Sequence, residues 1–125
     1  QLFAGGSGIT PMFSIIKTVL KSEPNSKITL YYANRDEAST IFKSQLDALQ
    51  SNNSNRLSIH YIYDNAPAGH AELYCGMMDV SKVTALIENH GDLTGNCEYF
   101  ICGPGPMMEN VKNVLSQLKI DSKKV

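Results

Sequence analysis

The pattern of hydrophobic and polar positions changes its period several times along the chain. Short runs rich in β-branched and aromatic residues predict strands, because such side chains fit a pleated, half-buried surface. Between these runs, apolar residues recur three and four positions apart, which is the spacing of one helical face. The predicted strands cover Leu2–Ala4, Lys27–Ala33, Leu57–Tyr63 and Glu98–Cys102.

Four amphipathic helices are predicted from the apolar stripes. The first has Pro11 in its first turn and Pro24 just past its end, two places where proline is favoured. Asp79 precedes the third helix and can cap its N-terminus. The stripes are Met12, Phe13, Ile15, Ile16, Val19 and Leu20; Ala38, Ile41, Phe42, Leu46 and Leu49; Val80, Val83, Leu86 and Ile87; and Met107, Met108, Val111, Val114, Leu115 and Leu118.

The alternation of strands and helices determines the expected fold. Successive βαβ units build a parallel sheet covered by helices, so we expect one α/β domain over residues 1–125, a doubly wound parallel sheet with helices on both faces. Loops are expected at Asn52–Asn55, Asn65–Gly69 and His90–Asn96. The chain starts inside a strand and turns polar from Asp121, so we expect a fragment whose first strand is truncated and whose last strand is missing.

Composition narrows the classes of function. The 125 residues carry a net charge of −1, so no basic excess points to nucleic acid or to an acidic membrane. No apolar run approaches the roughly 20 residues of a membrane span. Cys75, Cys97 and Cys102 lack paired spacing, which argues against a disulfide framework, a zinc site or an iron–sulfur cluster built from this chain alone. A reducing cytoplasm is therefore the expected location.

A glycine-rich turn joins the first predicted strand to the first helix. Its sequence, GGSGITP over Gly5–Pro11, allows a tight backbone turn and the close approach of a pyrophosphate. The helix start adds unpaired N–H groups and the positive end of a dipole, which favour phosphate, and Thr10 can cap the helix or bond a ligand. A turn without a ligand is the alternative interpretation, but the position at the carboxyl end of a strand favours a phosphate site.

Three related glycine motifs do not match this turn. A P-loop needs Gly-Lys-Ser/Thr after its glycines, and no such triplet is present here. A nucleophile elbow needs Gly-x-Ser-x-Gly, but Ile9 stands two positions after Ser7. The usual dinucleotide fingerprint ends in glycine, whereas Gly6-x-Gly8-x-x-Pro11 ends in proline and is a variant of it.

A second Gly/Pro turn follows the last predicted strand. The segment Tyr99–Met107 (YFICGPGPM) again leads from a strand into a helix. Ligands of open α/β sheets bind at the carboxyl edge of the strands, so we expect this turn beside Gly5–Pro11. Cys102 is expected on the rim with its side chain facing the cleft, although a cysteine that ends a strand is more often a packed core residue.

The two turns together resemble the NAD(P)H-binding domain of the ferredoxin–NADP⁺ reductase family, which includes cytochrome b5 reductases, flavohaemoglobins and oxygenase reductases. The resemblance rests on Gly5–Pro11 and on Cys-Gly-Pro-x-x-Met at Cys102–Met107, and it covers nearly the whole chain. Within the family, Tyr32–Arg35 (YANR) and Ala38–Phe42 (ASTIF) look most like the reductase component of phenylacetyl-CoA epoxygenase and its relatives.

This resemblance implies an enzyme in which NAD(P)H and FAD are bound by different domains. The chain would bind NAD(P)H and place its nicotinamide for hydride transfer to FAD, from which electrons pass to an iron–sulfur or oxygenase partner. The FAD would occupy a barrel domain before Gln1 of the same polypeptide, and a closing strand would follow Val125. A 2Fe-2S domain is a further implied possibility. The chain alone would then be catalytically incomplete.

The resemblance also implies roles for single residues. Gly6–Pro11 would hold the pyrophosphate and the adjoining ribose, with Thr10 near the nicotinamide. Cys102, with Gly103 and Pro104, would place the nicotinamide ring as a positioning residue, because no sequence neighbour supplies a base or a positive charge to make it a nucleophile. The candidate cofactor-binding residues are Gly6, Ser7, Gly8, Ile9, Thr10, Pro11, Asn34, Arg35, Cys102, Gly103, Pro104 and Met107.

The end of the second predicted strand bears on the choice of cofactor. In dinucleotide folds this end meets the adenosine ribose, where an acid favours the 2′-hydroxyl of NAD and an arginine favours the 2′-phosphate of NADP. The sequence Asn34–Glu37 (NRDE) contains both kinds of residue. Arg35 comes first, which favours NADPH, whereas an exposed turn in which Asp36 caps the next helix is the alternative.

The remaining histidines and methionines give weaker evidence of a functional site. His60, His70 and His90 are scattered without metal-ligand spacing, and the pairs Met77-Met78 and Met107-Met108 are typical core fillers.

Two other classes of function stay open beside the reductase. One is an α/β domain that binds another phosphate-bearing ligand without a flavin, and the other is a non-enzymatic module that senses a nucleotide.

Overall fold

A four-stranded parallel sheet forms the centre of the protein. The computed structural model describes residues 1–91 and 97–121, and within them the strand order is β3-β2-β1-β4. The first strand therefore lies inside the sheet, between the second strand and the fourth, as crossovers on both sides of it require. The strands are β1 (Leu2–Gly5), β2 (Ile28–Asn34), β3 (Leu57–Tyr63) and β4 (Phe100–Cys102).

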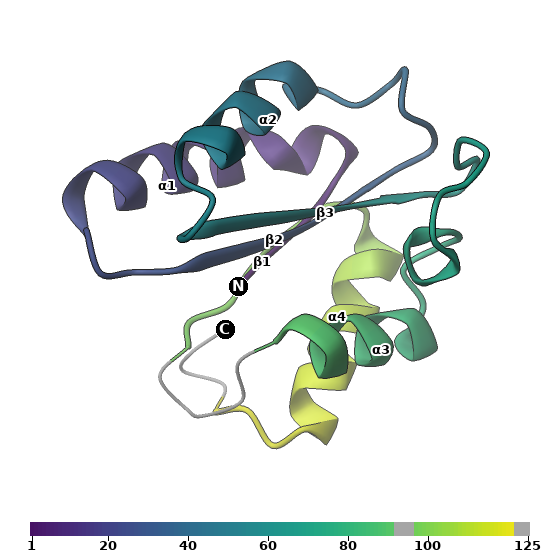
Figure 1. Ribbon diagram of the computed structural model, residues 1–125. Helices are drawn as coiled ribbons and strands as arrows, with labels where there is room; N and C mark the ends of the chain where they lie inside the picture. The colour runs from purple at the N-terminus through teal and green to yellow at the C-terminus, as the bar shows by residue number, and fades with distance from the viewer. Residues whose placement is uncertain (92–96, 122–125) are drawn as a thin grey trace.

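Helices cover both faces of this sheet (Figure 1). Helices α1 (Ile9–Ser22) and α2 (Lys43–Asn52) lie on one face, and α3 (Val80–His90) and α4 (Gly105–Gln117) lie on the other. Two short 3-10 turns, η1 (Gly6–Gly8) and η2 (Glu72–Tyr74), add to these elements. The arrangement confirms the predicted doubly wound α/β fold.

Alternating side chains of the inner strands pack into two hydrophobic cores, one on each face of the sheet. Phe3 and Tyr31 face α3 and α4, and their rings stack with centroids 4.7 Å apart. Ala4, Leu30 and Tyr32 face α1 and α2. Both faces of β1 and β2 are thus buried, which explains why their sequences read as nearly continuous apolar runs.

Helix α2 begins later than its apolar stripe predicted. The stripe started at Ala38, but the helix starts after Phe42, which adopts a left-handed φ of 62°. Asp36 accepts a hydrogen bond from the Ser39 N–H at 2.9 Å and so caps a turn ahead of the helix instead of the helix itself. Phe42 stacks on Phe13 with ring centroids 4.6 Å apart, and this tertiary contact holds the unusual backbone.

The other predicted elements need smaller corrections. Strand β4 has three residues instead of the five predicted for Glu98–Cys102. Asp79 caps α3 as predicted, since its Oδ1 accepts from the Lys82 N–H at 2.7 Å. Most of the predicted loop His90–Asn96, and the polar end after Asp121, lie outside the described residues. Among the residues described, no helix combines the length and apolarity that crossing a bilayer requires.

The C-terminal end of α1 is held by one arginine side chain. The Arg56 guanidinium donates to the carbonyls of Leu20 at 3.2 Å, Glu23 at 2.6 Å and, through Nε, Ser26 at 3.2 Å. A further contact of 3.4 Å reaches the carbonyl of Val19. These carbonyls belong to the helix end and the turn after it, where intrahelical partners run out. Arg56 therefore both caps α1 and ties it to the start of β3.

Two side chains and one loop N–H form hydrogen bonds with backbone groups on the outer edge of β3. Gln50 accepts the Ile59 N–H at 2.6 Å, and His70 Nε2 lies 3.0 Å from the Tyr61 carbonyl. Because a carbonyl oxygen only accepts, the His70 ring donates this bond. Farther along, the Gly76 N–H donates to the Tyr63 carbonyl at 2.9 Å.

Candidate functional site

The two Gly/Pro turns lie side by side at the carboxyl edge of the sheet. Strands β1 and β4 are parallel neighbours, with Ala4 opposite Cys102, so the turns that follow them leave the sheet together. A Cβ built on Gly5 would lie 2.7 Å from the Met107 sulfur and 2.9 Å from the Pro104 ring. This close approach confirms the juxtaposition that the sequence predicted.

Backbone packing explains two of the glycines in the first turn. A Cβ on Gly8 would collide with the Cys102 carbonyl group and lie 3.0 Å from the Gly103 nitrogen. Gly6 has a φ of 54°, a left-handed conformation that only glycine adopts without cost. Gly8 is thus required by its contact with the second turn, and Gly6 is required by its backbone conformation.

The start of α1 is well suited to an anion. Its N-cap is Gly8, no side chain within the described residues caps it, and its first turn contains no acidic residue. The Ile9 N–H bonds back into the turn, but the dipole of the 14-residue helix keeps its positive end at this edge. A phosphate group would supply the negative charge and the acceptors that the protein leaves out.

A groove of about 570 Å³ extends from these turns across the ends of the strands. Several predicted site residues line it together, namely Gly6, Asn34, Arg35, Pro104 and Met107. Asn34 Nδ2 is buried in the groove wall and has no hydrogen-bond partner among the described residues. Burying an amide donor in this way costs about 1–3 kcal/mol, which a ligand acceptor or a turned amide would relieve.

The far wall of the groove contains residues that the sequence analysis did not assign to a site, namely Asp64, Met77, Met78, Asp79 and Asn110. The prediction that Met77 is a core filler was wrong, because its side chain is exposed. Met77 is the most exposed large apolar side chain among the residues described, at 72%, while Asn110 donates to the Met78 carbonyl at 3.1 Å. Asp64 could have been found, because it directly follows β3 and the carboxyl ends of parallel strands share one edge.

Seven predicted site residues do not line the groove, namely Ser7, Gly8, Ile9, Thr10, Pro11, Cys102 and Gly103. Ile9 is fully buried in the core under α1 and α2, so its side chain has a packing role. Thr10 is exposed on the first turn of α1. Cys102 is half-buried and packs partly against the core under α1 and α2, so the side chain expected to face the cleft has a packing role as well. Ser7 and Pro11 are also exposed.

The loop between β2 and α2 is tied to the glycine turn. The Tyr32 hydroxyl donates to the Ile41 carbonyl at 3.0 Å and lies 3.4 Å from the Gly6 carbonyl. Burial raises the pKa of Tyr32, so the hydroxyl keeps its proton for this bond. Arg35, at the start of the loop, extends a side chain that is 73% exposed, and its Nε lies 3.9 Å from Asp36.

Two of the histidines, expected to be scattered, form one aromatic stack. The rings of His60 and His90 lie with centroids 3.9 Å apart, and His90 Nε2 is 2.7 Å from the Tyr74 hydroxyl. Burial, together with the charge of His90, lowers the pKa of His60 to about 4. His70 bonds the backbone of β3 instead. Within the described residues, no three His, Cys, Asp or Glu side chains gather as a metal site would require.

Comparison with known proteins agrees with this geometry. The family described as "Oxidoreductase NAD-binding domain" matches residues 2–113. A component of the 1,2-phenylacetyl-CoA epoxidase of Escherichia coli is 35% identical over 98% of this chain and 34% of its own length. NADH-cytochrome b5 reductase 1 of Laccaria bicolor is 32% identical over 94% of this chain and 38% of its own.

A solved structure shows the same fold. The cytochrome b5 reductase domain of Ulva prolifera nitrate reductase superposes with a TM-score of 0.81 at 27% identity, over 97% of this chain and 44% of that one. The chain thus spans less than half the length of these relatives. In those proteins the matching region is part of a larger polypeptide.

Proposed function

Since this chain belongs to the oxidoreductase NAD-binding domain family, we propose that it binds NAD(P)H and places the nicotinamide for hydride transfer to a FAD held elsewhere in the same polypeptide. The observation that carries this proposal is the packing of the Gly5–Gly8 turn against Cys102 and Gly103. FAD, when bound, accepts the hydride and passes its electrons on singly. The contribution of this chain is orientation, which can supply several kcal/mol of the barrier reduction.

The first turn is proposed to hold the pyrophosphate. Gly6–Pro11 surround the start of α1, where backbone N–H groups and the helix dipole meet a negative charge. Gly6 keeps its part of this surface free of a side chain, since a Cβ there would meet nothing within 4 Å, so phosphate oxygens can reach the backbone. Ser7 and Thr10 add hydroxyls that are exposed at the same place.

The nicotinamide is proposed to lie at the junction of the two turns, near Thr10 and Cys102. Gly103 and Pro104 adjoin Cys102 there, and a Cβ on Gly103 would lie 3.0 Å from the Gly5 nitrogen, so the absence of a side chain at Gly103 lets the two turns pack together. Cys102 acts as a positioning residue in this proposal, fixed by its packing and by the pairing of β4 with β1. The adenosine half then extends into the groove beyond Met107.

We propose NADPH as the preferred cofactor, because the loop after β2 leaves Arg35 available and occupies both neighbouring acids. Asp36 accepts the Ser39 N–H, and Glu37 faces Lys43 at 3.9 Å. Neither acid lines the groove, whereas Arg35 and Ser39 do. A guanidinium can hold a phosphate through two parallel hydrogen bonds.

Replacing Arg35 with alanine is expected to lower the preference for NADPH over NADH about tenfold, since the lost charge-assisted bonds serve only the 2′-phosphate. The measurement compares kcat/KM for both nucleotides in the full-length protein and the Arg35→Ala variant. Lys27→Ala, which removes an exposed cation at the opposite end of β2, serves as a control that leaves the ratio unchanged. An unchanged ratio in Arg35→Ala would contradict the proposed NADPH site.

The reductase itself is tested by cofactor removal. Full-length protein with FAD is expected to show bleaching of flavin absorption when mixed with NADPH under anaerobic conditions. After removal of FAD, nucleotide binding should remain while NADPH oxidation disappears, because this chain supplies orientation and FAD supplies the acceptor. Binding without flavin reduction in the FAD-loaded protein would instead favour a nucleotide-sensing module or a domain for another phosphate ligand.

Partners and location follow from the same proposal. The FAD-binding part is proposed to be a barrel domain of the same polypeptide that covers Thr10 and Cys102. Electrons would then pass to a 2Fe-2S domain or to an oxygenase. Cys75, Cys97 and Cys102 are all free thiols, which suits the reducing cytoplasm that we propose as its location.

A further inference from the structure

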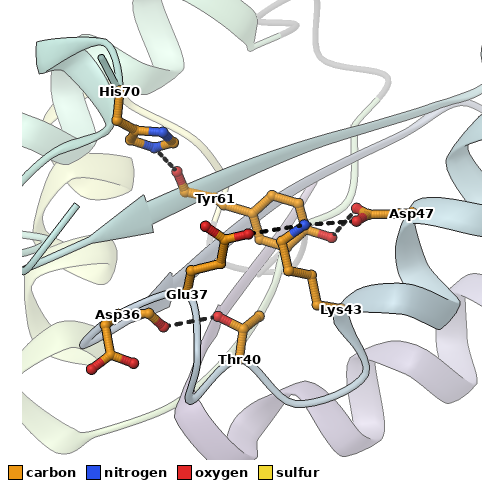
Figure 2. A network of polar contacts seen from close by, with 7 residues as sticks. All are labelled: Asp36, Glu37, Thr40, Lys43, Asp47, Tyr61 and His70. Carbon is orange, nitrogen blue, oxygen red and sulfur yellow. Dashed lines mark hydrogen bonds and ion pairs between the residues drawn. The ribbon is translucent and has the colours of Figure 1, made fainter. Parts of the chain in front are cut away.

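A polar network joins the loop after β2 to helix α2 and strand β3 (Figure 2). Lys43, the first residue of α2, donates from Nζ to Asp47 Oδ2 at 2.7 Å. The Tyr61 hydroxyl donates to the other oxygen of Asp47 at 2.6 Å. Both carboxylate oxygens are thus engaged, so Asp47 is a fixed anchor for the lysine.

Lys43 is held in one place from several sides. Its ammonium lies 5.0 Å above the Tyr61 ring as well as against Asp47, and its side chain is 31% exposed. The hydrogen bond to Asp47 raises the pKa of Lys43, so the group stays charged at neutral pH. Burial raises the pKa of Asp47, but the bonds from Lys43 and Tyr61 outweigh it and keep the carboxyl ionised.

This fixed cation faces Glu37. Lys43 Nζ lies 3.9 Å from Glu37 Oε1, and Figure 2 shows the glutamate turned toward Lys43 and Tyr61. Glu37 stands two residues from Arg35 and two from Ser39, which line the groove. Because residues on both sides of Glu37 in the same loop line the groove, a Glu37 side chain released from Lys43 could turn toward the ribose end of the groove.

A carboxylate at that place would reverse the chemistry of the site. It would accept a hydrogen bond from a 2′-hydroxyl and would repel a 2′-phosphate. Asp36 is withheld by a bond within its own turn, but Glu37 depends on Lys43, which belongs to the next helix. The loop therefore has one acid whose position is set from outside the loop.

We propose that Lys43 is a specificity-determining residue that holds Glu37 away from the nucleotide and so preserves the preference for a 2′-phosphate. Lys43 acts through Glu37 and is a positioning residue. The inference rests on the proposed NADPH site and adds to it a residue outside that site which contributes to the cofactor preference.

The test measures binding of adenosine 2′,5′-bisphosphate and adenosine 5′-monophosphate by calorimetry. These probes differ by the 2′-phosphate alone, so the ratio of their dissociation constants isolates its recognition. Lys43→Gln in the full-length protein is expected to lower the preference for the bisphosphate about three- to tenfold, the range of one partly exposed charge pair. Lys21→Gln makes the same charge change at the exposed far end of α1 and is expected to leave the ratio unchanged.

A second substitution separates release of Glu37 from direct contact between Lys43 and phosphate. The double variant Lys43→Gln/Glu37→Gln is expected to regain the parent ratio, because no carboxylate remains to be released. A double variant as impaired as Lys43→Gln would overturn the inference and assign Lys43 to the phosphate itself. An unchanged ratio in Lys43→Gln would also overturn it, with the NADPH site intact. A parent protein that binds both probes equally would contradict the NADPH site, and the inference with it.

Discussion

Replacing Gly8 with alanine in the full-length protein is expected to lower kcat/KM for NADPH about 100-fold, because a small misplacement of reacting groups is enough for a loss of this size. The added Cβ would meet the backbone of Cys102 and Gly103, which cannot rotate away as a side chain could. The two turns would have to separate, and the proposed phosphate and nicotinamide contacts would separate with them. The measurement is steady-state kinetics, together with the flavin content of each preparation.

Gly105 offers a matched control for this substitution. It is the first residue of α4 at the same edge of the sheet, and a Cβ built there meets no atom within 4 Å. Gly105→Ala is therefore expected to keep the parent kinetics. Equal activity of Gly8→Ala and Gly105→Ala would show that close packing of the two turns does not position the cofactor.

Arg56→Ala is expected to reduce the free energy of unfolding by about 2–4 kcal/mol, since a charged donor is removed from several carbonyls at once. Those carbonyls end α1 and form the turn after it, and other donors are scarce at a helix C-terminus. Urea unfolding at neutral pH, followed by circular dichroism, measures the change.

Arg56→Lys separates the charge from the shape of the guanidinium. A lysine keeps the positive charge near the negative end of the helix dipole but cannot bond carbonyls in several directions, so an intermediate loss is expected. Lys27→Ala, on an exposed side chain next to β2, is the control for the loss of a surface cation. If Arg56→Ala unfolds at the same urea concentration as the parent, the cap carries no stability.

The sequence predicts what depends on local pattern and on the carboxyl-edge rule. The glycine turn and the turn at Gly103 could be placed together because each follows a strand of the same parallel sheet. The start of α2 could not be predicted, because Phe42 leaves the helical conformation to stack on Phe13, which is distant in sequence. A stripe of apolar residues indicates burial but does not say whether the backbone is helical.

The candidate site was likewise only partly predictable from the sequence. Arg35 and Asn34 could be proposed from their place at the end of a strand. The far wall of the groove, with Met77 and Asn110, depends on how the segment after β3 folds back against α4, and no local period encodes that path. The link from Lys43 to Glu37 depends on tertiary placement of Tyr61 as well, so it also appears only in three dimensions.

The hydrogen bonds on the outer side of β3 bear on how copies of this protein behave toward one another. An exposed strand edge is a template on which another chain can add a strand, and such pairing leads to aggregation. Here Gln50 occupies the Ile59 N–H, His70 occupies the Tyr61 carbonyl, and Gly76 occupies the Tyr63 carbonyl. An incoming strand that paired along this edge would have to displace these three bonds. The two side chains and the loop backbone that bond the outer edge of β3 therefore also oppose self-association through this edge.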